Sequence, residues 1–342
     1  MGAVGSAVAA RLLSTRNPDD QFGFAAGSNE RAALLRASGV TLGGAGLAVA
    51  CSAAIAADEI GAELPRLANG ALYELILLCT RAQETEPALA VSQALLARDG
   101  AIVCLQNGLP EEKVAARVGA ARTLGAVIGW SATSVARGSV RLTGRGSFLL
   151  GTSDSAGERQ LENARQLLSR AFPTRVTRNL AGARWSKLAL NCAISTLGAV
   201  SGLSFGELCL RADARGLVLA CIAEVVQVAQ AKRVKLSRIS GLDPRWLADS
   251  GSSRAMARIA RPWRHALLRL VSRQRPTQRS GMLERLLAGR SSGQIEDLNG
   301  AVVAQARALN LAVPLNERLL ARVRAIEQGD ERIGVHAFAE LS

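Results

Sequence analysis

The pattern of hydrophobic and polar positions changes about halfway along the 342-residue chain. In the first half, short apolar runs typical of buried β-strands alternate with stretches of helical periodicity that are rich in Ala, Leu and Arg. The strand-like runs are QFGFAA, VTLGG, LYELILLC, AIVCLQN, TLGAVIGWSATSV, SVRLTG and SFLLG. From about residue 181 the strand pattern stops, and helical stretches follow one another, interrupted by segments rich in Gly, Ser and Pro.

This change predicts two domains. Strands that alternate with helices indicate a largely parallel sheet, so we expect an α/β domain over residues 1–180 and an all-helical domain over residues 181–342. No apolar run reaches the ~18 residues of a membrane-spanning helix, so we expect no integral membrane association. Six cysteines without a C-x-x-C pair indicate small core residues in a reduced, cytoplasmic protein.

A formal net charge of +14 raises the question of an anionic partner. Residues 235–280 hold ten arginines and one lysine against two aspartates, a local net charge of +9. On a helix these arginines form a basic face opposite Trp263, Leu267 and Leu270, and such a face is usually solvated. Aromatic residues, which stack on bases, make up only 3% of the chain. We therefore interpret this segment as a basic insertion and expect no nucleic-acid partner.

The first residues, MGAVGSAVAARLL, contain two glycines in G-x-x-G spacing followed by a helical run. This is the second half of the dinucleotide fingerprint G-x-G-x-x-G, in which glycines let a helix N-terminus approach a pyrophosphate. Gly2, Ala3, Val4 and Gly5 are therefore candidate cofactor-binding residues. The first glycine and the strand before it are missing, which leaves two explanations: a start codon assigned too late, or a truncated, decaying gene.

The second strand-like run ends in GSNER, where the sequence bears on cofactor choice. A site specific for NAD has an Asp or Glu at this strand end to bind the ribose hydroxyls. Here Gly27, Ser28 and Asn29 take that place and Arg31 lies close by, while we interpret Glu30 as the start of a helix. We therefore expect the cofactor to be NADPH, with Ser28 and Arg31 near its 2′-phosphate.

The segment ARWSKLALNCAIS carries one lysine among alanines and leucines. At helical spacing, Lys187, Asn191 and Ser195 occupy positions i, i+4 and i+8 and form a narrow polar stripe on an apolar helix. Burial of a lysine is costly unless its charge is used or paired. From this segment alone, a functional lysine and a lysine that extends to solvent remain alternatives.

Further motifs follow in a defined order: LILLCTRAQET, CLQNGL, WSKLALNCAIS and IEDLNGAVV. With the glycine turn, they resemble the ketopantoate reductase (2-dehydropantoate 2-reductase) family over nearly the whole chain. The resemblance implies a Rossmann-type NADP-binding domain, here without its first strand, followed by a helical domain of the 6-phosphogluconate dehydrogenase-like type. It also implies an active site between the two domains and NADPH-dependent reduction of a 2-oxo acid, ketopantoate to pantoate, on the route to coenzyme A.

The resemblance assigns roles to particular residues. Lys187 falls on the family's catalytic lysine, which donates a proton as hydride reaches the carbonyl carbon. Asn191 falls on an asparagine that helps to bind substrate, and Asn107 on one near the nicotinamide and the substrate. Arg81 stands where the family usually has a lysine near the cofactor, which keeps the charge but changes its geometry.

Three substrate-binding positions depart from the family pattern. Ser195 replaces an asparagine, Gly281 a serine and Gln294 a glutamate. Glutamine still binds a hydroxyl but lacks the charge of a carboxylate. These changes favour a relaxed or altered substrate or a lower efficiency. The alternatives are a reductase of a different 2-oxo acid and a catalytically weak or inactive nucleotide-binding relative, and a homodimer is left open.

Two other signals carry less weight. The segment GLSFG matches the G-x-S-x-G nucleophile motif of hydrolases, but that motif requires a preceding strand and a partner histidine. The two histidines, His265 and His336, are far apart in the sequence, and no cysteine pair accompanies them. We therefore expect neither a hydrolase nor a metal site.

Overall fold

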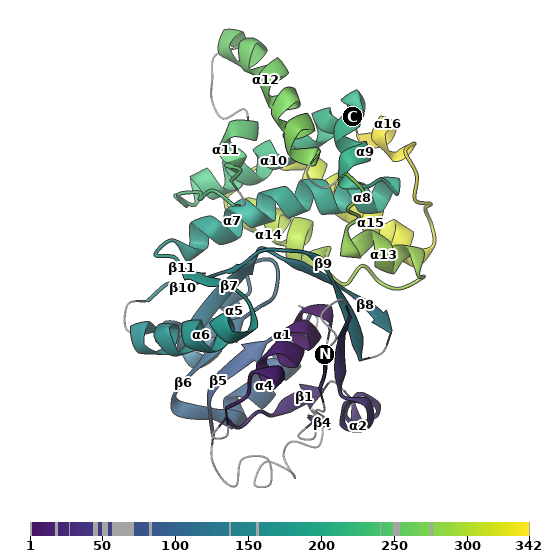
Figure 1. Cartoon of the computed structure of the whole chain (residues 1–342). Coiled ribbons are helices and arrows are strands. Elements are labelled where there is room, and N and C mark those ends of the chain that lie inside the picture. The colour runs from purple at the N-terminus through teal and green to yellow at the C-terminus, as the bar shows by residue number, and fades with distance from the viewer. Residues whose placement is uncertain are drawn as a thin grey trace. The chain divides into compact units, whose positions relative to one another are not determined.

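The computed structural model describes residues 2–17, 20–26, 28–43, 47–49, 54–56, 72–81, 84–136, 138–154, 157–239, 241–248, 254–273 and 276–341. The chain divides into two compact units, whose helices and strands Figure 1 labels. The α/β unit comprises Met1–Gln106 and Pro110–Leu180, and the helical unit comprises Asn107–Leu109 and Ala181–Ser342. The predicted class, an α/β fold followed by an all-helical one, is confirmed.

The α/β unit has three sheets among its described residues. Its strands are β1 (Phe24–Ala26), β2 (Val40–Gly43), β3 (Leu47–Val49), β4 (Ala54–Ala56), β5 (Tyr73–Leu78), β6 (Leu96–Cys104), β7 (Thr123–Ile128), β8 (Ser131–Ala136), β9 (Ser139–Gly144), β10 (Phe148–Thr152) and β11 (Thr174–Val176). The strand orders are β11-β10-β7-β6-β5, β3-β2-β9-β8 and β1-β4. Every residue of β7 is buried, as expected of a central strand that helices cover on both faces.

The expectation of a largely parallel sheet was only partly right. β5, β6 and β7 pair in parallel, but β10 runs antiparallel to β7, and β8 runs antiparallel to β9. Only two residues separate β8 from β9, and such a short connection allows a hairpin but no parallel crossover. The apolar runs predicted most of the strands. The short connection sets the direction of β9 against β8, whereas the direction of β10 depends on packing between distant segments.

The helices of the α/β unit surround these strands. They are α1 (Ala3–Ser14), α2 (Asn29–Ser38), α4 (Thr85–Leu95), α5 (Glu111–Val118), a short 3-10 helix (Ala120–Arg122) and α6 (Glu158–Ala171). The buried face of α1 contributes Val8 and Leu12 to the core that contains Leu42, Val103 and Leu124. The apolar run after the two glycines thus forms a helix that packs on the strands, as its pattern predicts.

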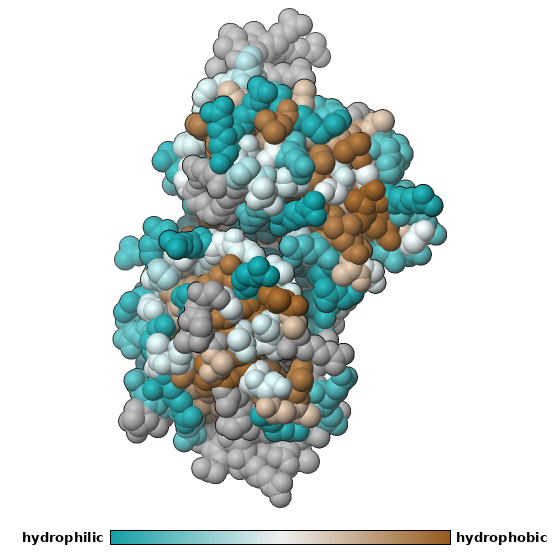
Figure 2. Space-filling view, turned by 45° about the vertical axis from the view of Figure 1, so that its right-hand side comes forward, coloured by the Kyte–Doolittle hydropathy of each residue, from teal (hydrophilic) through white to brown (hydrophobic). Residues whose placement is uncertain are grey.

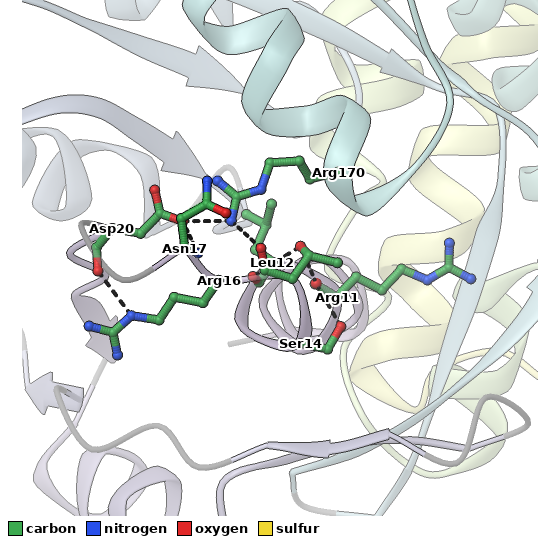
Figure 3. A network of polar contacts seen from close by, with 8 residues as sticks. Arg11, Leu12, Ser14, Arg16, Asn17, Asp20 and Arg170 are labelled. Atoms are coloured by element: carbon green, nitrogen blue, oxygen red, sulfur yellow. Dashed lines mark hydrogen bonds and ion pairs between the residues drawn. The ribbon is translucent and has the colours of Figure 1, made fainter.

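Polar contacts hold the C-terminal end of α1 against the end of α6 (Figure 3). Arg170 of α6 donates hydrogen bonds of 2.6 Å to the carbonyl oxygen of Thr15 and to Oδ2 of Asp20. Arg11 donates to the carbonyl oxygen of Ala171 at 2.8 Å. These contacts satisfy carbonyl groups that helix ends leave without an intrahelical partner. They fix the direction of α1, and therefore of its N-terminus.

The helical unit is built around the long helix α10. Its elements are α7 (Leu180–Leu190), a π-helical turn (Asn191–Ser195), α8 (Thr196–Ser201), α9 (Phe205–Leu210), α10 (Ala212–Ala231), α11 (Pro244–Leu247), α12 (Arg254–Ser272), α13 (Gly281–Leu287), a second π-helical turn (Glu296–Gly300), α14 (Ala301–Ala308), α15 (Pro314–Gln328) and α16 (Ala337–Leu341). Its core includes Leu188, Leu197, Ile222 and Leu319, all buried. No helix in the described part of the chain combines the length and apolar composition that crossing a membrane requires.

The apolar positions of α12 are not all covered. Leu268 is fully buried, whereas Trp263 is 52% exposed and Leu270 is 59% exposed. The predicted apolar face is therefore turned so that part of it lies at the surface. Figure 2 shows exposed apolar side chains, in brown, grouped among the hydrophilic surface of the helical unit.

Candidate active site

Lys187 lies on α7, in the last turn before the first π-helical turn. The helix continues through this turn into α8 (Figure 1). Lys187 is partly buried, while its neighbours Ser186 and Leu188 are buried almost completely. Ser186 accepts a hydrogen bond from the backbone N–H of Ser237 at 3.0 Å, which anchors this helix to the segment after α10. The lysine therefore projects from a helix that this hydrogen bond holds in place.

The surroundings of Lys187 favour its neutral form. Burial and, to a smaller extent, the positive charge of Arg184 together lower the pKa of Lys187 from 10.5 to about 7. Arg184 is only 3% exposed and lies three residues earlier on α7, so both side chains point to the same side of the helix. A lysine with a pKa near neutrality can hold or release a proton at physiological pH, which suits a general acid.

The residues Asn191 and Ser195 lie in the first π-helical turn, where an ordinary α-helix was expected. In an α-helix, positions four residues apart drift by about 40° around the axis. A π turn contains more residues per turn, so the angle between Asn191 and Ser195 differs from this α-helical value. Both side chains are partly buried, and neither hydrogen-bonds to another residue of the described ranges. Their polar groups are therefore open to a ligand.

The structure brings Asn107 and Gln294 into contact within the helical unit. Nδ2 of Asn107 donates a hydrogen bond of 3.2 Å to Oε1 of Gln294. The next residue, Gly108, has a φ of +80°, and a Cβ at this position would lie 2.5 Å from the carbonyl oxygen of Asp297. Glycine is required here because its backbone adopts this conformation and packs directly on the second π turn.

Gly281 and its neighbour Ser280 lie at the start of α13. Gly281 is the first residue of α13, is exposed, and would meet no atom within 4 Å if it carried a Cβ. The hydroxyl of Ser280 accepts a hydrogen bond from the backbone N–H of Leu283 and donates one of 3.0 Å to the carbonyl oxygen of Ser195. The serine thus caps α13 and ties it to the first π turn, whereas Gly281 offers only its backbone.

The candidate cofactor residues Gly2, Ala3, Val4 and Gly5 form the start of α1. Gly2 is the exposed N-cap residue, in an extended conformation, and its carbonyl accepts the first helical hydrogen bond from Ser6. The first turn of α1 has no acidic residue, so no carboxylate competes with an anion for its N–H groups. Such a helix N-terminus can hold the pyrophosphate of a dinucleotide.

The other candidate cofactor residues follow strands of the α/β unit. Ser28 lies between β1 and α2 and is partly buried, while the side chain of Arg31 lies outside the described residues. Arg81 follows β5, and its guanidinium lies 3.3 Å from Glu84. Gln106, after the neighbouring strand β6, donates hydrogen bonds to Thr80. The ends of two adjacent parallel strands are thus joined at the edge where open α/β sheets bind ligands.

Sequence reasoning missed a buried polar network. Thr196, Asn299, Asn316 and Glu224 are linked by side-chain hydrogen bonds inside the helical unit. The first three are fully buried. In the sequence these residues are isolated polar positions within helical stretches, with no pattern that relates them. Only their burial in the folded structure identifies them as members of a hydrogen-bonded network.

One of the two discounted motifs has a structural explanation. Ser204 of GLSFG is the N-cap of α9: its hydroxyl accepts from the N–H of Glu207, and Glu207 accepts from the N–H of Ser204. Such a capping box gives the serine a purely structural task. Across the described ranges, no three His, Cys, Asp or Glu side chains form a group that could hold a metal ion.

Comparison with known proteins gives a consistent result along the chain. The sequence model described as "Ketopantoate reductase PanE/ApbA" matches residues 1–155, and that of "Ketopantoate reductase PanE/ApbA C terminal" matches residues 179–327. The chain is 26% identical over 259 residues to the 2-dehydropantoate 2-reductase of Pyrococcus horikoshii, covering 75% of this chain and 77% of the relative. It is 28% identical over 261 residues to that of Halobacterium salinarum, covering 75% and 76%.

Solved structures share the fold. A PanE/ApbA family ketopantoate reductase from Ralstonia eutropha matches with a TM-score of 0.73 and 24% identity over 97% of both chains. A ternary structure of D-mandelate dehydrogenase with NADH and anilino(oxo)acetate matches with a TM-score of 0.78 and 20% identity over 96% of both chains.

Proposed function

Because the chain belongs to the ketopantoate reductase family, we propose that it uses NADPH to reduce a branched 2-oxo acid, ketopantoate, to the corresponding 2-hydroxy acid, pantoate. When bound, NADPH would supply the hydride that the carbonyl carbon accepts. As the carbonyl double bond becomes a single bond, negative charge develops on oxygen. The proton for this oxygen comes from Nζ of Lys187, which gives the alcohol and leaves a neutral amine.

The environment of Lys187 is the observation that carries this proposal. A partly buried ammonium with a pKa of about 7 stabilises developing oxyanion charge and releases its proton readily. The lysine stands where the family has its catalytic lysine, and the open polar groups of Asn191 and Ser195 follow it on the same helical rod. This combination is expected of a carbonyl reductase.

The remaining candidates divide between substrate and cofactor. We assign Asn107, Asn191, Ser195, Gly281 and Gln294 to the substrate, with the Asn107–Gln294 pair near its hydroxyl. The start of α1, Gly2, Ala3, Val4 and Gly5, is assigned to the pyrophosphate, and Arg81 and Asn107 to the cofactor's nicotinamide side. Ser28 and Arg31 are assigned to the 2′-phosphate. Ser28 stands where a site specific for NAD has an Asp or Glu, and Glu30 lies in the first turn of α2, so we propose NADPH rather than NADH as the coenzyme.

The test is steady-state oxidation of NADPH and of NADH with ketopantoate and a panel of other branched and aromatic 2-oxo acids. We expect turnover with NADPH, and kcat for Lys187→Ala lower by several orders of magnitude while the Kd of NADPH changes little. Arg31→Ala should raise the KM of NADPH and leave that of NADH unchanged. Undiminished turnover by Lys187→Ala would refute the assigned role of the lysine.

Two other results lead to the alternatives. Turnover of another 2-oxo acid, but not of ketopantoate, would assign the altered positions Ser195, Gly281 and Gln294 to a different substrate. NADPH binding without turnover of any acid in the panel would refute the proposed activity and favour a catalytically inactive relative. The cytoplasmic location and the absence of a nucleic-acid partner stay predictions from the sequence, and a homodimer stays open.

A further inference from the structure

The two π-helical turns of the helical unit contain or closely follow candidate substrate residues. The first turn, Asn191–Ser195, contains two of them. The second turn, Glu296–Gly300, begins two residues after Gln294, whose carbonyl oxygen accepts hydrogen bonds from the N–H groups of Asp297 and Leu298. π turns are rare and less favourable than α-helical turns, and they are frequent at functional sites. Their persistence here requires tertiary contacts that hold them.

Asn299, inside the second turn, reaches the first. Its Oδ1 accepts a hydrogen bond of 2.7 Å from the hydroxyl of Thr196, the residue directly after the first turn. Its Nδ2 donates a longer hydrogen bond, 3.4 Å, to the carbonyl oxygen of Cys192 within that turn. Thr196, Asn299 and Cys192 are each 0% exposed. In the dry interior these bonds are not exchanged for bonds to water, and breaking one leaves a buried polar group unsatisfied.

The orientation of the Asn299 amide is fixed from the other side. Glu224 of α10 accepts hydrogen bonds of 2.9 Å from the backbone N–H groups of Leu315 and Asn316, at the start of α15. A carboxylate only accepts, so the side chain of Asn316 must present its Nδ2 to Glu224, at 2.7 Å. Its Oδ1 then faces Asn299, whose Nδ2 donates to it at 2.9 Å. This leaves Oδ1 of Asn299 for the Thr196 hydroxyl.

From these contacts we infer that Asn299 is a positioning residue for the substrate pocket. Through its bond to Thr196, it holds the first π turn in a fixed register with the second. The side chains of Asn191 and Ser195, in the first turn, then keep a fixed position relative to Gln294, which precedes the second turn. The identity of the bound molecule rests on the proposed function, whereas the mechanical coupling of the two turns does not.

The test compares Thr196→Val with Thr196→Ser. Valine keeps the shape of threonine but removes the donor to Asn299, whereas serine loses a methyl group and keeps the donor. For Thr196→Val we expect the KM of the 2-oxo acid to rise about tenfold, with the KM of NADPH and the pH dependence of kcat unchanged, because small displacements of binding groups weaken substrate binding. Thr196→Ser should retain the wild-type KM, although it loses some stability.

Ser201→Ala is the matched control. Ser201 is a buried hydroxyl on the same helix, but it donates to the carbonyl oxygen of Leu197 and not to the second π turn. We expect this variant to lower the melting temperature without changing the KM of the 2-oxo acid. If Thr196→Val fails to fold, Thr196→Ala is measured in the same way. The inference would be overturned if the KM of the 2-oxo acid in Thr196→Val, or in Thr196→Ala in its place, equalled that of wild type. It would also be overturned if Ser201→Ala raised this KM as much as Thr196→Val does.

A second readout does not depend on turnover. Hydrogen exchange of the backbone amides should accelerate in both π turns in Thr196→Val, although only the first adjoins the substitution, and should stay near wild type in Thr196→Ser. Acceleration confined to the first turn would refute the coupling. If wild type reduces no 2-oxo acid, the proposed function fails, and this exchange experiment still decides whether Asn299 couples the turns.

Discussion

Nδ2 of Asn107 lies 3.2 Å from Oε1 of Gln294, although 187 residues separate the two in the chain. This bond fixes the side-chain amide of Gln294, because its oxygen faces Asn107 and its NH2 group is left to face the other side. A glutamine held in this way donates to a substrate hydroxyl or carbonyl, where a glutamate would accept.

Gln294→Glu should therefore strengthen binding of a substrate hydroxyl. A carboxylate accepts charge-assisted hydrogen bonds both from Asn107 and from the substrate, and such bonds are worth about 1.5–3 kcal/mol against about 1 kcal/mol for neutral ones. We expect the KM for ketopantoate to fall about tenfold, measured by NADPH oxidation. Gln294→Ala, which removes both bonds, should raise it. A KM that rises in Gln294→Glu as much as in Gln294→Ala would contradict this role.

Gly108→Ala tests the loop that carries Asn107. The added Cβ meets the carbonyl oxygen of Asp297 at 2.5 Å, and the φ of +80° is strained for alanine by about 1–2 kcal/mol. We expect a lower melting temperature and a higher KM for the 2-oxo acid. Gly119→Ala, with a φ of +88° but no atom within 4 Å of the added Cβ, is the control for backbone strain alone. It should lower stability and leave KM unchanged; a matching rise of KM would point to a general effect of strain.

The lowered pKa of Lys187 predicts how stability depends on pH. Between about pH 7 and pH 10.5 the amine of Lys187 binds a proton in the unfolded chain but not in the folded chain. This difference makes the free energy of unfolding rise with pH. Below about pH 7 the lysine is charged in both states, and the full cost of burying its charge applies. Lys187→Met should thus be more stable than wild type by at least ~1 kcal/mol near pH 6, with a smaller advantage near pH 9.5. Urea unfolding at the two pH values measures this difference.

The same substitution at Lys113, exposed on α5, controls for the loss of one positive charge. A stability advantage of Lys187→Met that stays constant from acid to alkaline pH would show that the lysine carries no buried charge.

Arg170→Met tests how α1 is held. The variant loses the hydrogen bonds to Thr15 and Asp20 but keeps an apolar stem, and we expect a loss of about 1 kcal/mol. Arg170 lowers the pKa of Asp20. The stabilisation is therefore present above the usual pKa of 3.8 and disappears as the pH falls through the lowered value. Arg165→Met removes an exposed pair with Glu162 on the same helix and should cost less. Equal losses for both variants in urea melts near neutral pH would exclude a special role of Arg170.

The sequence predicted the helix around Lys187, since its apolar positions repeat at helical spacing. It did not predict the π turn, because widening one turn leaves the pattern of apolar residues unchanged. The positions of Asn107 and Gln294 came from resemblance alone, since no local pattern relates residues so far apart. Thr196 and Asn299 escaped notice for the same reason: only tertiary folding pairs their polar groups. The direction of β10, the exposure of Trp263 and the cap role of Ser280 likewise depend on packing between distant segments.

The short loop Asn107–Leu109 is part of the helical unit, although the residues on both sides of it in the sequence belong to the α/β unit. The helical unit is consequently discontinuous in the gene. A fragment that starts at residue 181 would encode the helices without the glycine that packs on Asp297 and without the partner of Gln294. One recombination event at the boundary could not exchange this unit between relatives intact. The proposed substrate pocket is inherited complete only if two separate stretches of coding sequence are transmitted together.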